Sequence, residues 1–142
     1  MGVTMESQHY IADFSYGGFR RLRTKVAELT APDIFQHYKK LDYAFYLYGK
    51  ERETFFADYN KKIKELDNEY HGEKSDILDF LYLSDCGGKL DAAHCKSVWE
   101  IIQNYDDDIC YGYSGLPDCA KFADFKKIIK DGMELGTGVK WY

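Results

Sequence analysis

The sequence contains only two prolines in 142 residues and no long apolar run. Proline breaks helix interiors. Its scarcity, together with blocks rich in Lys, Glu, Leu and Ile, therefore favours helices. No apolar stretch is long enough to cross a bilayer, and no basic segment followed by an apolar run opens the chain. We therefore expect no membrane association, no secretory signal and a cytoplasmic location, where the four cysteines would be reduced.

Patterns typical of catalysis are also missing. The chain has no Gly-x-Ser-x-Gly elbow and no phosphate-binding loop, and none of its four histidines stands in a recognisable nucleophile setting. A non-catalytic protein without a cofactor is the expectation. The formal net charge of −5 argues against a dedicated nucleic-acid binder, because such proteins present a basic surface to phosphates.

What the chain does contain is enough apolar material for a core. Apolar residues make up 45% of the sequence, with 13 tyrosines and 9 phenylalanines among them, and the length suits one domain over 1–142. Apolar positions recur at helical spacing. The expected helices cover roughly 17–29, 32–48, 51–70, 76–83 and 92–105, with a last one from Pro117 onward. The sequence thus predicts a compact all-α bundle of about six helices.

Local signals set the ends of these helices. Ser15, Pro32 and Ser75 are expected at helix starts, and Gly49 and Gly72 at helix stops. The segments "GVTM" and "GVKWY" at the two ends of the chain are extended in character. A short β pair between the termini is therefore possible within the helical fold.

The segment "SDCGGKLDAAHCKSVWEII", 84–102, resembles an EF-hand loop that has lost most of its ligands. With Gly88 at the sixth loop position, Leu90, Asp85 and Asp91 fall where that loop expects them, at positions eight, three and nine. The first, fifth and twelfth positions carry no acidic residue. We expect a helix–turn–helix corner in which Gly88 allows the turn, Leu90 enters the core and Asp91 caps the next helix.

Metal binding is kept as an alternative to this structural corner. Calcium would use Asp85 and Asp91. Zinc would use the four cysteines, although they contain no Cys-x-x-Cys pair. The side chains present therefore favour no metal as the first expectation.

An acidic, tyrosine-rich loop offers a candidate partner-binding surface. Residues 84–118 carry two lysines against seven Asp and Glu. The candidate contact residues are Asp106, Asp107, Asp108, Tyr111 and Tyr113. Tyrosines elsewhere, such as Tyr43, Tyr46 and Tyr48, are too many for one core, and exposed tyrosines suit protein recognition. Another protein is therefore the expected partner.

A basic amphipathic helix gives a second alternative. Arg20, Arg21, Arg23 and Lys25 are expected to face away from the apolar side of the first helix. Such a face could meet nucleic acid. The more ordinary interpretation is a surface whose arginines balance the acidic loop.

The pattern Ser84-Asp85-Cys86-x-Gly88-x-Leu90, followed by Cys95, resembles that of a group of small uncharacterised proteins from bacteria and their phages or prophages. The "MGV" start and the aromatic tail are similar as well. This resemblance implies a mobile-element origin and no assigned activity. For a phage-encoded protein it implies a host-directed inhibitor in the host cytoplasm as one form of the binding function.

Overall fold

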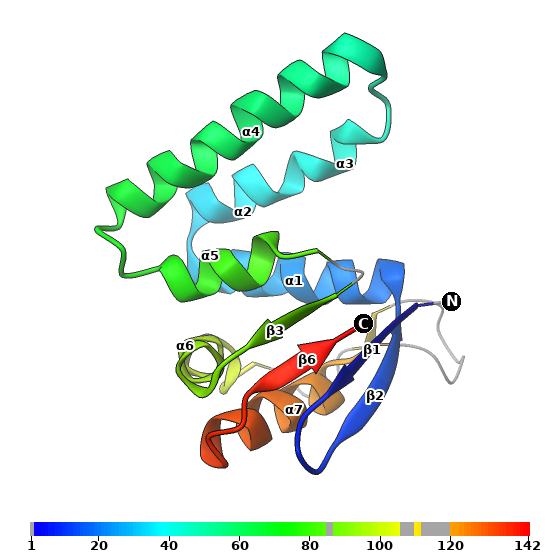
Figure 1. Cartoon of the computed structure of the whole chain (residues 1–142), viewed down its shortest axis with the longest axis vertical. Coiled ribbons are helices and arrows are strands. Elements are labelled where there is room, and N and C mark those ends of the chain that lie inside the picture. The colour runs from blue at the N-terminus through cyan, green and yellow to red at the C-terminus, as the bar shows by residue number, and fades with distance from the viewer. Residues whose placement is uncertain (1, 85–86, 106–109, 112–119) are drawn as a thin grey trace.

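The computed structural model describes residues 2–84, 87–105, 110–111 and 120–142 (Figure 1). The helices are α1 (Tyr16–Thr30), α2 (Pro32–Lys39), α3 (Leu41–Ala44), α4 (Gly49–Glu69), α5 (Ser75–Tyr82), α6 (Ala92–Ile102) and α7 (Phe122–Glu134). The strands are β1 (Gly2–Glu6), β2 (Ile11–Ser15), β3 (Gly88–Leu90), β4 (Cys110–Tyr111), β5 (Ala120–Lys121) and β6 (Val139–Trp141).

The all-α prediction is wrong, because the chain builds an antiparallel sheet with the order β2-β1-β6-β3 beside its helices. The protein is therefore α+β. The expected pairing of the termini is confirmed, with Met5 opposite Trp141 between β1 and β6. The rest of the sheet was missed because strands of three to five residues are too short to show a clear period-two pattern.

The sheet has one buried and one polar face. Val3 and Met5 of β1, with Val139 and Trp141 of β6, point into the core. Alternate side chains on the other face form polar pairs, such as Lys140 Nζ with Glu6 Oε1 at 2.9 Å. This alternation is the pattern of an antiparallel sheet that is covered on one side only. Helices α1, α6 and α7 lie on the buried side (Figure 1).

Aromatic rings fill the core between the sheet and the helices that cover it. Phe80 of α5 lies edge-on to Trp141 and stacks on Phe125 of α7, with ring centroids 5.9 and 5.7 Å apart. Phe19 of α1 packs on both Phe80 and Trp141. All four rings are almost fully buried. We call the sheet together with α1, α5, α6 and α7 the body.

The EF-hand-like corner is a helix–strand–helix connection instead. Leu90 is buried and the Asp91 carboxylate accepts a hydrogen bond from the His94 amide at 2.9 Å, so the predicted core plug and helix cap are confirmed. The prediction for Gly88 is wrong. Gly88 lies in β3 opposite Trp141, and a Cβ atom there would sit 2.3 Å from the indole Cζ2. Glycine is required by the close approach of the indole ring, not by a turn.

Most predicted helix ends are confirmed. Ser15 Oγ accepts a hydrogen bond from the Gly18 amide at 2.9 Å and so caps α1, and Pro32 occupies the first turn of α2. Two ends differ. Gly49 does not stop a helix but opens α4, with a left-handed φ of 55°. The last helix begins at Phe122 and not at Pro117, since residues 120–121 form β5.

Helices α2, α3 and α4 form a hairpin that rises from the body (Figure 1). We call it the arm, residues 32–69. Of the 21 residues of α4, only Tyr59 and Leu66 are buried. Ile34 and Tyr38 of α2 are buried, whereas Phe45 is exposed because the chain leaves the α2 axis after Lys39. Among the described residues, no helix has both the length and the apolar character needed to cross a membrane.

Candidate functional site

The end of α3 and the turn from it into α4, at the end of the arm, carry a group of exposed aromatic side chains. We call this group the aromatic turn; its members and exposed fractions are Tyr43 (59%), Phe45 (70%), Tyr46 (76%) and Tyr48 (80%). The sequence predicted that tyrosines here would be surplus to the core, and three of the four are those tyrosines. Large aromatics left in solvent within one short segment are unusual unless they contact a partner.

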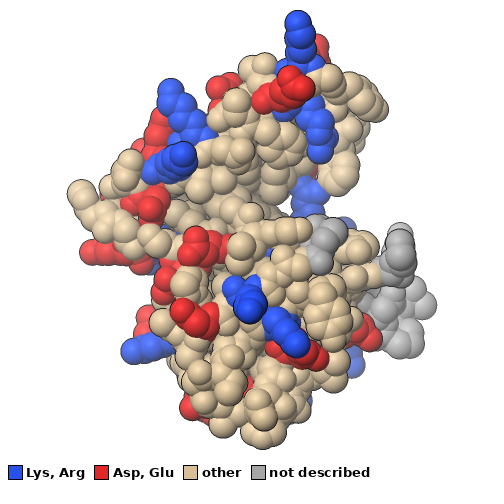
Figure 2. All heavy atoms as spheres, in the orientation of Figure 1, with Lys and Arg blue, Asp and Glu red and all other residues tan. Residues whose placement is uncertain are grey.

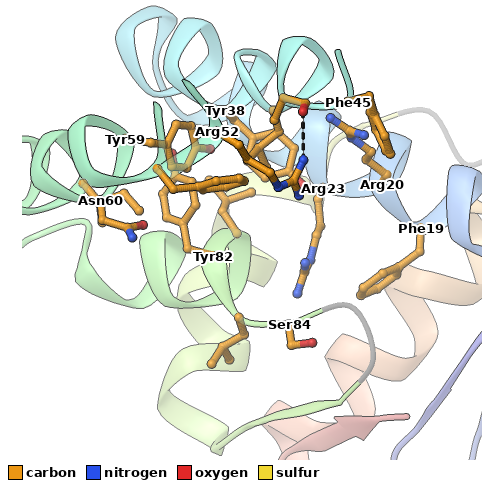
Figure 3. Close-up of a pocket in the computed structure, with 16 residues that line it drawn as sticks. Phe19, Arg20, Arg23, Tyr38, Phe45, Arg52, Tyr59, Asn60, Tyr82 and Ser84 are labelled. Carbon is orange, nitrogen blue, oxygen red and sulfur yellow. Dashed lines mark hydrogen bonds between the residues drawn. The ribbon is translucent and has the colours of Figure 1, made fainter. Parts of the chain in front are cut away.

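A pocket of about 420 Å³ lies between the arm and the body. Figure 2 shows the surface hollowed at this level, with Lys and Arg atoms in the hollow. Its walls come from α1, from the α2–α3 segment, from α4 and from the end of α5. Six aromatic side chains line it, and Figure 3 labels all of them except Phe56: Phe19, Tyr38, Phe45, Phe56, Tyr59 and Tyr82. The volume lies within the range of ordinary small-molecule sites.

Three arginines line this pocket. Arg52 of α4 donates from Nη1 to the Ala44 carbonyl at 2.9 Å and lies over the Phe56 ring. Arg20 of α1 pairs with Asp42 at 2.6 Å and lies 5.2 Å from the centroid of Phe45. Arg23 reaches down toward Ser84 at the inner end (Figure 3). Among the described residues, the lining contains no Asp or Glu.

A buried histidine joins the arm to the body beside the pocket. His37 stacks on the Tyr59 ring at 4.0 Å, and its Nε2 lies 3.1 Å from the Tyr59 carbonyl. A carbonyl can only accept, so Nε2 carries the proton and Nδ1 accepts from the Tyr82 hydroxyl at 2.6 Å. Burial is the main cause that lowers the pKa of His37. His37 is therefore a neutral link between α2, α4 and α5.

The basic face predicted on the first helix is divided by the structure. Arg23 is buried, with its guanidinium 4.7 Å from the Phe19 ring centroid and close to the rings of Phe80 and Trp141. Lys25 pairs with Glu28 at 3.1 Å. Arg20 turns into the pocket and Arg21 is exposed. A continuous strip of these four side chains is not formed on the helix surface.

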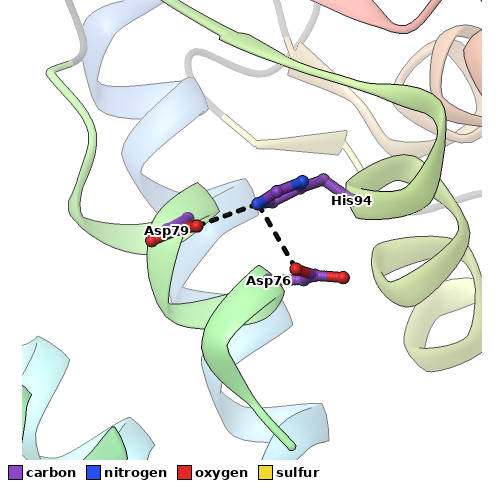
Figure 4. Close-up of side chains that lie close together, drawn as sticks. All are labelled: Asp76, Asp79 and His94. Atoms are coloured by element: carbon purple, nitrogen blue, oxygen red, sulfur yellow. Dashed lines mark hydrogen bonds and ion pairs between the residues drawn. The ribbon is translucent and has the colours of Figure 1, made fainter. Parts of the chain in front are cut away.

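A second cluster surrounds His94 at the start of α6. Its Nε2 lies 2.8 Å from Asp79 Oδ2 and 3.3 Å from Asp76 Oδ1, both on α5 (Figure 4). Its Nδ1 lies 2.7 Å from Asp91 Oδ1. Partial burial opposes the charged ring, but hydrogen bonds to Asp79 and Asp91 and the charge of Asp76 outweigh it and raise the pKa of His94. The imidazolium form therefore ties α6 to α5.

The same cluster is where a metal ion could bind. Asp76, Asp79 and His94 each offer a ligand atom, and these atoms lie within 4.8 Å of one another. The set differs from the predicted one. Asp91 caps α6 and holds the other nitrogen of His94, and Asp85 lies outside the described residues. Burial raises the pKa of the Cys95 thiol to about 12, so this cysteine is a poor zinc ligand.

The candidate contact residues of the acidic loop fall almost entirely outside the part of the chain that the structure describes. Asp106, Asp107, Asp108 and Tyr113 lie outside the described residues, and of Tyr111 only the backbone in β4 is described. The partner surface predicted there stays a prediction.

Reasoning from the sequence did not identify several residues of the pocket and of the His94 cluster. Arg52, Asn60 and Tyr82 looked like ordinary helix positions, because nothing local brings α4 and α5 together around Arg20. The His94 cluster could have been predicted from the spacing of its residues. Asp76 and Asp79 stand three apart in a helix and Asp91 stands three before His94, which places each pair on one face.

No protein-family model, no curated protein and no solved structure significantly matches the chain. The resemblance of residues 84–95 to the bacterial and phage group stays a prediction.

Proposed function

We propose that this chain is a non-catalytic binding protein that recognises another protein through the aromatic turn. One observation carries the proposal: Tyr43, Phe45, Tyr46 and Tyr48 expose more than half of their surface within six residues. Tyrosine and other aromatics are enriched at protein interfaces, where each buries a large rigid area at little entropic cost.

The position of the turn supports the same function. It lies at the end of the arm, away from the aromatic core of the body (Figure 1). The arm adds few residues to the hydrophobic core, because α4 buries only Tyr59 and Leu66. A long helix that buries so little contributes less to folding than its length would suggest, so presenting the turn is the use we assign to it.

The geometry of the histidines supports a non-catalytic function. Both ring nitrogens of His37 and of His94 are engaged in hydrogen bonds with neighbouring groups. None of these hydrogen bonds joins either ring to a Ser or Cys side chain that could act as a nucleophile. If the chain is phage-encoded, as its resemblance implies, a host-directed inhibitor is the form that this binding would take.

The test compares the aromatic turn with tyrosines exposed elsewhere. Tyr46→Ser/Tyr48→Ser is the test variant, and Tyr10→Ser/Tyr142→Ser is the matched control on the body. Both are used as bait in host lysate, and the retained proteins are quantified against wild type. We expect the turn variant to lose a partner that the control retains. Equal retention by both variants would contradict a role of the turn.

A second candidate function, metal binding, is favoured by the convergence of Asp76, Asp79 and His94. Thermal melting with Zn²⁺, Ca²⁺ and chelator tests it, with His94→Gln and Asp79→Asn as variants. A bound ion at a hundred times its Kd adds about 2.7 kcal/mol to the free energy of unfolding. We expect that shift in wild type and its loss in both variants. An unchanged melting temperature in wild type removes this candidate.

A further inference from the structure

The pocket between the arm and the body combines cationic side chains with aromatic walls, a combination that selects a ligand class. We propose that it binds a small molecule or chain end that carries an aromatic ring and, on a short chain beside it, a carboxylate. The site differs from the aromatic turn in what it recognises and shares only Phe45 with it.

The cations define the charged end of the ligand. In a chain of net charge −5, this pocket gathers Arg20, Arg23 and Arg52, and its described lining has no acidic residue. A planar guanidinium matches a carboxylate with two parallel hydrogen bonds. Arg52 uses one donor, Nη1, for the Ala44 carbonyl, and this bond fixes the side chain at the wall with further donors on the same group.

Arg20 is held in a way that a ligand can exchange. Its partner Asp42 is 64% exposed and does not line the pocket. Exposed ion pairs contribute little to stability, so a carboxylate inside the pocket can take the place of Asp42 at small cost. The Phe45 ring packs against the same guanidinium and, like it, lines the pocket.

The walls define the rest of the ligand. Tyr38, Phe56, Tyr59 and Tyr82 line the pocket from α2, α4 and α5. The Tyr59 ring is already fixed by stacking on His37, and Tyr82 by its hydrogen bond to the same ring. Rigid rings of this kind favour an aromatic group packed against them. A volume of about 420 Å³ accommodates one such ring with a short acidic chain.

The experiment uses the full chain and two probes that differ only in charge, N-acetylphenylalanine and its neutral amide. Binding is followed by NMR titration of backbone amides. We expect saturable shifts near Asn60 and Leu83, which line the pocket, and binding of the amide at least about tenfold weaker, because charge-assisted hydrogen bonds are lost. Absence of saturable shifts, or equal affinity for both probes, would overturn the proposal.

Matched variants locate the effect. Arg52 is an exposed side chain of α4, so Arg52→Gln should fold, and circular dichroism verifies this. We expect Arg52→Gln to weaken acid binding about tenfold and to leave the amide unchanged. Arg21→Gln, on α1 but outside this pocket, should bind both probes as wild type does. The proposal is wrong if Arg21→Gln and Arg52→Gln have the same effect.

The carboxylate could belong to a free small molecule or to the C-terminus of a polypeptide. A short glycine peptide that ends in phenylalanine distinguishes the two sources of the carboxylate. It is tested with a free and with an amidated C-terminus. Tighter binding than N-acetylphenylalanine indicates a polypeptide terminus, and equal binding a small molecule; both support the site. The Tyr46→Ser/Tyr48→Ser variant should bind the probe as wild type does, so failure of the aromatic turn and failure of the pocket are distinguishable.

Discussion

Helices α7 and α4 show how differently the body and the arm use their residues. In α7, seven of 13 residues are buried, including Phe122, Phe125 and Ile129. In α4, two of 21 residues are buried. Both helices have apolar residues at helical spacing, so the pattern alone does not distinguish them. The sheet and α6 pack against α7, and Phe80 of α5 stacks on Phe125. By contrast, α4 packs mainly against α2 of the arm and α5 of the body. Most of the buried core therefore lies in the body, whereas the recognition surface that we propose lies on the arm.

The largest expected effect is the loss of a central ring of the body. Phe80→Ala removes the side chain that packs on Phe19, Phe125 and Trp141. We expect the free energy of unfolding to fall by about 3–5 kcal/mol, as for other buried Phe→Ala changes. Urea denaturation measures it. A loss below about 1 kcal/mol would mean that this cluster is not the centre of the fold.

A smaller effect is expected when the body is overfilled. Gly88→Ala places a methyl group against the Trp141 indole, and we expect a loss of about 1–3 kcal/mol, also measured in urea. Gly17→Ala is the control, since a Cβ at Gly17 meets no atom within 4 Å. That control should be neutral or slightly stabilising. Equal effects of the two changes would refute the role assigned to Trp141.

The two histidines should give opposite pH dependences. The raised pKa of His94 gives stability that is full below the unfolded pKa, near 6.5, and is lost as pH rises through the folded pKa. The lowered pKa of His37 gives stability that is present above pH 6.5 and is lost as pH falls through the folded pKa. His94→Gln should therefore cost more at pH 5.5 than at pH 8, and His37→Gln the reverse.

Urea denaturation of both variants at the two pH values measures this difference. His71→Gln serves as a control, because His71 lies in the turn after α4 and is exposed. Slopes of the same sign for His37→Gln and His94→Gln would show that the two sites do not hold opposite charge states.

The smallest effect is expected at the end of the arm. Tyr46→Ser should change the free energy of unfolding by less than about 0.5 kcal/mol, because the ring is 76% exposed. Thermal melting of Tyr46→Ser and of Phe80→Ala under the same conditions compares their losses of stability directly. A loss comparable to that of Phe80→Ala would show that the aromatic turn is needed for folding, and the separation of arm and body would fail.

Much of the local structure could be predicted from the sequence. The caps Ser15 and Asp91 and the first-turn Pro32 were placed correctly because a cap depends only on residues within one turn of it. The extended ends of the chain and their pairing were predicted as well. The short strand β3 was missed, since its three residues become a strand only by pairing with β6. The arm–body pocket was missed for the same reason: α1, α4 and α5 come together only in three dimensions.

By itself, the sequence determined where most helices begin and how polar and apolar residues alternate along them. Tertiary structure decided which of the periodic apolar residues are buried, so that Phe19 enters the core and Phe45 stays in solvent. It also decided that position 88 must be a glycine, because the Trp141 indole lies against it, and that Arg23 is buried while Arg21 is exposed. Caps and periodicity arise from contacts within a turn or two, whereas burial depends on partners that are distant in the chain.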